Sequence, residues 1–197
     1  MKKITLVMFA LIGLAFTAQA QIQKGNVLIG GDVANLNLSL EKGGNFTGSI
    51  SPKAAWFIQD NLALGGYVNF GITTYNGGGS TVSYGVGPLA RYYAGGGNEI
   101  IKHGRFFGEA NVGFQGINYA STPGIQNGGS TNGLGLGVGP GFAYFITPSI
   151  GLETLLKYNA VAGFGNNGYS SALNLNFGFQ VYLPGRSTAR KVRNDVR

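Results

Sequence analysis

Apolar and polar residues alternate along most of this chain with a period of two, the repeat of a β-strand whose side chains point to opposite faces. Runs rich in Gly, Asn, Ser and Pro separate the alternating segments and are typical of turns and loops. The pattern predicts eight strands, at residues 26–40, 47–58, 62–75, 81–93, 105–119, 132–146, 150–160 and 171–183. The first strand changes its parity partway along, which indicates a β-bulge near Ala34.

The sixth predicted strand has glycine along one whole face. Every second residue from Gly133 to Gly141 is glycine, and the residues between them are apolar. A dinucleotide-binding loop needs a different glycine spacing, so this stretch is not a phosphate-binding motif. It indicates a tightly curved barrel wall with apolar side chains on the outside. The bare backbone on the inside leaves space that large inward residues can fill. Large inward residues of this kind are Tyr67, Arg91, Tyr93 and Phe145.

The polar faces of the strands indicate which solvent surrounds them. Charged residues make up 11% of the chain, against about a quarter in ordinary soluble domains. Within the strands they fall on the polar face, which otherwise holds mainly Gly, Asn and Ser. A soluble sandwich presents a charged face to water, whereas a transmembrane barrel turns an uncharged face to lipid and a polar face to its lumen. The sequence therefore predicts an all-β fold, a transmembrane antiparallel up-and-down β-barrel of eight strands, closed so that no strand edge is unpaired in lipid.

Both ends of the chain lie outside the predicted barrel domain, which spans residues 21–183. In residues 1–20, two lysines follow Met1, a short apolar run comes next, and the segment ends in Ala-Gln-Ala, the pattern of a cleaved secretory signal peptide. Residues 184–197 start with a strand-breaking Pro-Gly and hold five basic residues and one acid. This basic tail accounts for much of the net charge of +7. It either contacts anionic headgroups or the cell wall, or forms a disordered end.

The connections between strands predict an orientation in the membrane. Residues 59–61 and 147–149 are tight turns, residues 120–131 and 161–170 are longer, and the long connection at 94–104 departs from this alternation. Because eight strands bring both mature ends to the side of the tight turns, both are expected in the periplasm of a Gram-negative bacterium. Four aromatic residues on the apolar face near that side are expected to form an interfacial girdle, namely Trp56, Tyr92, Phe106 and Tyr144.

The signal peptide, the eight strands and the final strand NLNFGFQVYL make the chain resemble the small eight-stranded outer-membrane barrels, typified by outer membrane protein X and the barrel domain of outer membrane protein A. The resemblance covers essentially the whole mature chain. It implies that the last strand carries a signal for the barrel-assembly machinery, at Asn176, Gly178, Val181 and Leu183. One departure is the basic tail, because members of this superfamily often end at the last strand with an aromatic residue.

Three acids and three bases are predicted to point into the lumen. They are Asp32, Glu109 and Glu153, with Lys53, Arg91 and Lys157. An eight-stranded barrel is just wide enough for its side chains to fill, and buried charges are tolerated mainly when they are paired. We interpret these residues as an interior ion-pair network that plugs the lumen, which favours a structural or surface-interaction role without enzymatic activity. The alternative is a narrow porin-like channel for small solutes.

Catalytic chemistry finds little support in the sequence. Some small outer-membrane barrels that this chain resembles modify lipid A, with a His and a Ser at the outer rim. The one histidine, His103, falls in the 94–104 connection on the opposite side, and no cluster of residues has metal-ligand spacing. A lipid-modifying enzyme is therefore a remote alternative, and no cofactor, metal ion or nucleic acid is expected. The outer loops, rich in Asn, Gly, Ser and Thr, either bind a surface ligand or merely close hairpins.

Overall fold

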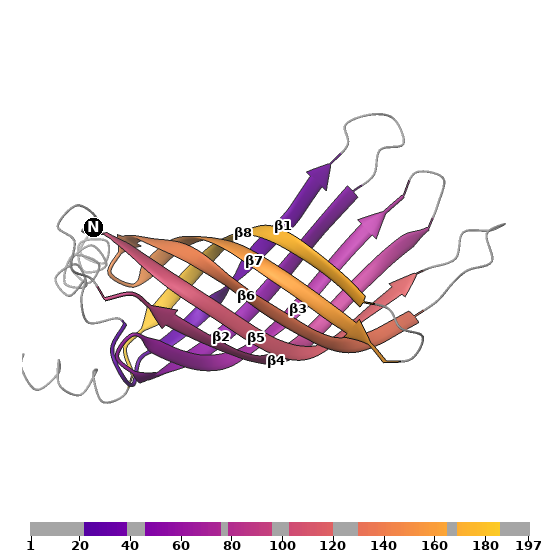
Figure 1. The fold of residues 1–197 in the computed structure, drawn as a ribbon. Helices are drawn as coiled ribbons and strands as arrows, with labels where there is room; N and C mark the ends of the chain where they lie inside the picture. The colour runs from indigo at the N-terminus through magenta and orange to yellow at the C-terminus, as the bar shows by residue number, and fades with distance from the viewer. Residues whose placement is uncertain are drawn as a thin grey trace, which may run out of the picture.

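The structure is a computed structural model, and it describes residues 22–38, 46–75, 79–95, 103–119, 130–164 and 169–185. Eight strands form one antiparallel sheet, in which each strand pairs with its neighbours in the sequence and β1 also pairs with β8 (Figure 1). The strands are β1 (Val27–Leu38), β2 (Phe46–Gln59), β3 (Leu62–Thr74), β4 (Ser80–Tyr93), β5 (Gly104–Tyr119), β6 (Ser130–Thr147), β7 (Ile150–Gly163) and β8 (Tyr169–Leu183). The predicted closed up-and-down barrel is confirmed. No helix among the described residues is long and apolar enough to cross a membrane.

The strands match the predicted segments, with boundaries that differ by a few residues. β6 begins at Ser130 and β8 at Tyr169, two residues earlier than predicted in each case, because backbone pairing continues where the side chains no longer alternate. The pairing of β1 with β2 shifts register between Ala34 and Asn37, so the predicted bulge is present. The predicted signal peptide and most of the basic tail lie outside the described residues.

The two ends of the barrel differ in their connections. At one end, here called the turn end, Asp60 and Asn61 join β2 to β3, and Pro148 and Ser149 join β6 to β7. Asn61 has φ 67°, a left-handed conformation that asparagine tolerates better than most residues. β1 begins and β8 ends at the turn end, on the left in Figure 1. The other end, where β1, β3, β5 and β7 finish, is called the loop end.

The outer surface of the barrel is apolar. Large hydrophobic side chains point outward from each of the eight strands, with Val68 50%, Val138 58% and Phe177 59% exposed. Six charged side chains of these strands point the other way, into the lumen. Exposing so much apolar area to water would cost a large free energy, whereas lipid accepts it. The fold is therefore that of a barrel surrounded by lipid.

The lumen is divided into two halves along the barrel axis. Near the turn end it holds the buried apolar core, which includes Leu28, Phe57, Leu89, Phe107 and Tyr182. Nearer the loop end, the inward positions carry amides and hydroxyls. Charged side chains lie between the two halves, because the inward positions of several strands place them at the same level.

Candidate functional site

The centre of the lumen is an ion-pair network built from five strands. β1 supplies Asp32, β2 Lys53, β4 Arg91, β5 Glu109, and β7 both Glu153 and Lys157. Each occupies an inward position of its strand, and Arg91 lies directly opposite Glu109 in the β4–β5 register. The structure thus brings together all six charged residues identified in the sequence.

Glu109 lies at the middle of this network and accepts hydrogen bonds from three cations. Lys53 Nζ is 2.9 Å from Glu109 Oε2, Arg91 Nη2 is 2.6 Å from the same oxygen, and Lys157 Nζ is 3.0 Å from Oε1. Lys53 Nζ also donates to Asp32, and Arg91 Nη1 lies 2.7 Å from Glu153 Oε2. Three positive and three negative charges therefore cancel.

Water has little access to these charges. The side chains of the paired residues are at most 6% exposed, except Lys157 at 12%. Buried ions in an apolar setting are costly, and their mutual attraction offsets this cost only when geometry and hydrogen bonding are good. The network satisfies this condition through Glu109, which pairs with three cations, one from each of β2, β4 and β7.

An aromatic layer covers the network on the side of the turn end. Tyr182 donates a hydrogen bond of 2.7 Å to Glu153, and its hydroxyl is 2.7 Å from that of Tyr93. The Phe107 ring lies 4.2 Å from the Arg91 guanidinium carbon, a cation–π contact. Phe57 and Phe145 complete the layer by packing on these tyrosines. Of these five residues, only Tyr93 and Phe145 are among the large inward residues predicted from the sequence, although the inward parity of the others was a usable signal.

The glycine face of β6 makes room for side chains of the adjacent strands. A methyl group at Gly135 would collide with Gln115, one at Gly137 with Asn111 and Lys157, and one at Gly141 with the Phe107 ring. The four large residues named from the sequence are not among the atoms nearest to this face. The reason is spatial, because β5 and β7 flank β6 in the sheet and their inward side chains lean over its bare backbone.

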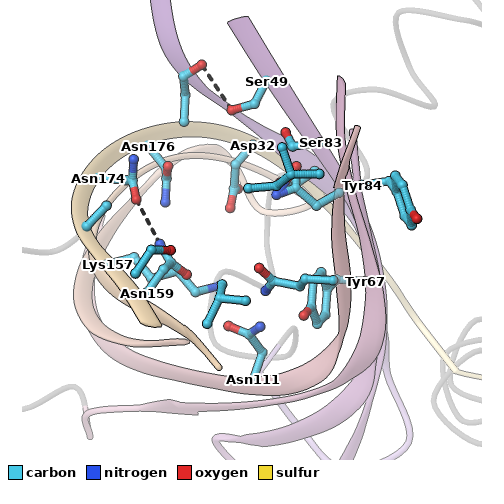
Figure 2. A pocket seen from close by; sticks show the side chains of 18 of the residues that line it. Asp32, Ser49, Tyr67, Ser83, Tyr84, Asn111, Lys157, Asn159, Asn174 and Asn176 are labelled. Atoms are coloured by element: carbon cyan, nitrogen blue, oxygen red, sulfur yellow. Dashed lines mark hydrogen bonds between the residues drawn. The ribbon is translucent and has the colours of Figure 1, made fainter. Parts of the chain in front are cut away.

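A polar cavity of about 490 Å³ lies on the loop-end side of the network. Figure 2 shows Asp32, Tyr67, Asn111 and Lys157 around it, drawn from different strands of the wall. Hydroxyl and amide groups dominate the remaining lining, with residues such as Ser49, Ser83, Gln115, Asn159, Asn174 and Asn176. The charged network therefore separates an aromatic compartment from a polar one.

The aromatic residues expected to form a girdle lie on the outer surface. Trp56, Tyr92, Phe106 and Tyr144 are all at least half exposed, and each lies close to the turn end of its strand. The Phe106 ring contacts Phe142 with centroids 5.0 Å apart, and the His103 ring lies 6.3 Å from that of Tyr144. Their role at a membrane interface remains a prediction.

The proposed assembly residues of β8 divide between its two faces. Asn176 is buried and lines the polar cavity, and Gly178 lies against Asp32, where a methyl group would collide with the carboxylate. Val181 and Leu183 belong to the outward parity of the strand, as Phe177 and Phe179 do. The two inward residues thus have a packing role of their own, and an assembly role for all four stays a prediction.

Groups that could catalyse a reaction or hold a metal ion are sparse. His103 is exposed, and its described ring contact is with Tyr144. Within the part of the chain that the structure describes, no group of three His, Asp or Glu side chains is placed to hold a metal ion.

The fold and the apolar outer surface define the class of protein, a closed eight-stranded β-barrel of the transmembrane kind. Neither the protein-family models nor the curated proteins compared with the sequence match it. Among solved structures, the chain is similar to Neisserial surface protein A, with 20% identity, a TM-score of 0.53, and coverage of 79% of this chain and 95% of that one. It is also similar to the outer membrane protein OprG of Pseudomonas aeruginosa, with 14% identity, a TM-score of 0.48, and coverage of 83% and 98%. Ail, the attachment invasion locus protein of Yersinia pestis, gives 12% identity, a TM-score of 0.47, and coverage of 80% and 99%.

Proposed function

We propose that this protein is an integral outer-membrane barrel with a closed lumen and a structural or surface-interaction role, and that it has no enzymatic activity. The observation that carries the proposal is the ion-pair network with its aromatic cover. Arg91, Glu109 and Glu153 span the lumen from β4 to β7, and Tyr93 and Tyr182 seal the side of the turn end. An ion crossing this level would have to displace paired, buried charges, which costs several kcal/mol.

The proposed location and orientation follow from the outer surface. The uncharged belt suits a bilayer, and the four girdle aromatics suit its interface at the turn end. We infer that both mature ends face the periplasm of a Gram-negative bacterium, with outer-membrane lipid around the barrel. The basic tail at residues 184–197 would then lie where it can contact anionic headgroups or the cell wall.

A narrow porin-like channel is the second candidate, because the polar cavity already leaves open space in the lumen on one side of the network. Conduction would require the network and the aromatic layer to part. Nothing comparable supports a lipid-modifying enzyme, since His103 is near the turn end, on the far side from the proposed cell surface.

Ion conductance of the refolded protein in a planar bilayer tests the closed lumen. We expect no steady openings from the wild type, while a large porin inserted under the same conditions shows that the bilayer reports channels. Arg91→Ala and Lys157→Ala test the alternative, with Lys24→Ala as a matched control, because Lys24 is exposed and lies outside the strands. Steady wild-type openings whose size or ion preference changes in the first two variants, and not in the control, would show that the charges line a pore.

A further inference from the structure

The polar cavity on the loop-end side of the network is large enough to hold a small molecule. Its volume of about 490 Å³ falls within the range of small-molecule sites, roughly 300–1,000 Å³. The lining runs from Lys53 and Glu109 in the network to Tyr169 and Ser170, the first residues of β8 at the loop end. A molecule arriving from the loop end would therefore meet a polar wall and a charged floor.

Three lining atoms have no hydrogen-bond partner among the described residues. They are the Tyr67 hydroxyl, Asn69 Oδ1 and Asn111 Oδ1, all on the inward faces of β3 and β5. Tyr67 and Asn111 are each 7% exposed, so these groups are withdrawn from bulk solvent. Buried polar groups in folded proteins nearly always have partners, so these three indicate that another molecule supplies them.

The charges around the cavity indicate that this molecule is neutral. Asp32 and Glu109 disfavour an anion, Lys53 and Lys157 disfavour a cation, and the four are already paired with one another. The unpaired groups comprise two carbonyl oxygens, which need donors, and a hydroxyl, which both donates and accepts. A molecule with several hydroxyl groups meets all three needs.

We propose that the cavity is a binding site for a small, neutral, polyhydroxyl ligand of monosaccharide size, which enters from the loop end and whose hydroxyls pair with Tyr67, Asn69 and Asn111. Gly137 has a direct part in this site, because its lack of a side chain leaves the space that Asn111, Asn159 and Lys157 occupy. The site goes beyond the proposed function, since a barrel can be closed without binding any ligand.

Amide NMR of the refolded mature protein in detergent micelles tests the site, with D-glucose as the neutral probe and D-glucosamine and D-glucuronate as charged ones. We expect saturable shifts at the loop-end halves of β3 and β5 with glucose, and at least about tenfold weaker binding of both charged sugars. Asn111→Leu and Tyr67→Phe should each weaken glucose binding by about tenfold. Asn118→Leu is the matched control, because Asn118 lies on the same strand but on its outward face.

The inference is overturned if glucose gives no saturable shift up to about 100 mM, which would mean that water alone satisfies the cavity. It is also overturned if binding persists unchanged in Asn111→Leu and Tyr67→Phe while their spectra show an intact barrel. These results are distinguishable from failure of the proposed function. A conducting barrel that binds glucose refutes only the closed lumen, and a silent barrel that does not bind refutes only the site.

Discussion

Glu109 forms ion pairs with more strands than any other side chain of the ion-pair network, because its two oxygens bind cations from three strands. Arg91 links this carboxylate to Glu153, whose remaining described partners are the hydroxyls of Tyr93 and Tyr182. A buried carboxylate held by one cation and two phenols depends strongly on that cation. Removal of Arg91 therefore leaves Glu153, whose side chain is 1% exposed, without a cationic partner among the described residues.

We expect Arg91→Met to lower the free energy of unfolding by about 3–5 kcal/mol, because it leaves Glu153 without a cationic partner. Urea unfolding of the refolded protein in lipid vesicles measures this change. Adding Glu153→Gln to Arg91→Met should recover part of the loss, since the second change removes the unpaired charge. Arg105→Met, the matched control, should cost less than about 1 kcal/mol. An Arg91→Met protein as stable as the wild type would show that the network does not stabilise the barrel.

Among the strands, β6 shows most clearly how an element with few side chains on one face determines the interior. Its inward glycines make two kinds of contact. Gly133 and Gly139 approach the backbone of β7, whereas Gly135 and Gly141 are covered by side chains from β5. An added side chain on this face thus meets either rigid backbone or a packed neighbour, so a β6 without its glycines would not fit the same lumen.

Gly139→Ala should lower the free energy of unfolding by about 1–3 kcal/mol, because its methyl group would collide with the Leu156 carbonyl of β7. Gly108→Ala on β5 is the matched control, since a methyl group there meets nothing within 4 Å. That control should be neutral or stabilising by up to about 1 kcal/mol, because alanine favours a strand more than glycine does. The same unfolding assay compares the two variants. Equal stabilities would mean that β6 and β7 separate at little cost.

At the scale of the whole molecule, the apolar belt indicates that the barrel lies in a bilayer, and the four proposed girdle aromatics predict the level of one membrane surface. The girdle residues lie near the turn end on β2, β4, β5 and β6, so they encircle a large part of one rim. Aromatic side chains with an apolar body and a polar edge are favoured at the level of the headgroups. The turn-end rim is thus expected at one membrane surface, with the apolar belt across the hydrocarbon core.

The depth of this rim can be measured through Trp56, the single tryptophan of the chain, which is 57% exposed on the outer face. In vesicles of brominated lipids, we expect its fluorescence to be quenched more strongly by bromine near the headgroup than by bromine near the end of the acyl chain. Stronger quenching by the chain-end bromine would place Trp56 near the bilayer centre and contradict the girdle. Trp56→Phe supplies the background signal.

The sequence by itself determined the number, order and inward faces of the strands, because the side-chain period of two is a local property that each segment carries independently. It also identified the bulge near Ala34 and the six inward charges, since parity assigns a face without any knowledge of neighbours. For the same reason, the apolar outer faces were sufficient to predict a barrel in lipid.

Only the tertiary structure decided which inward side chains meet. Three features depend on register between strands that are far apart in the sequence. They are the central place of Glu109, the aromatic layer of Phe57, Phe107 and Tyr182, and the cavity's amide oxygens without a partner among the described residues. Closure of the barrel sets the position of each residue along the barrel axis, and parity alone contains no information about that position. The division of the lumen into an aromatic half and a polar half therefore became visible only once the eight strands were paired.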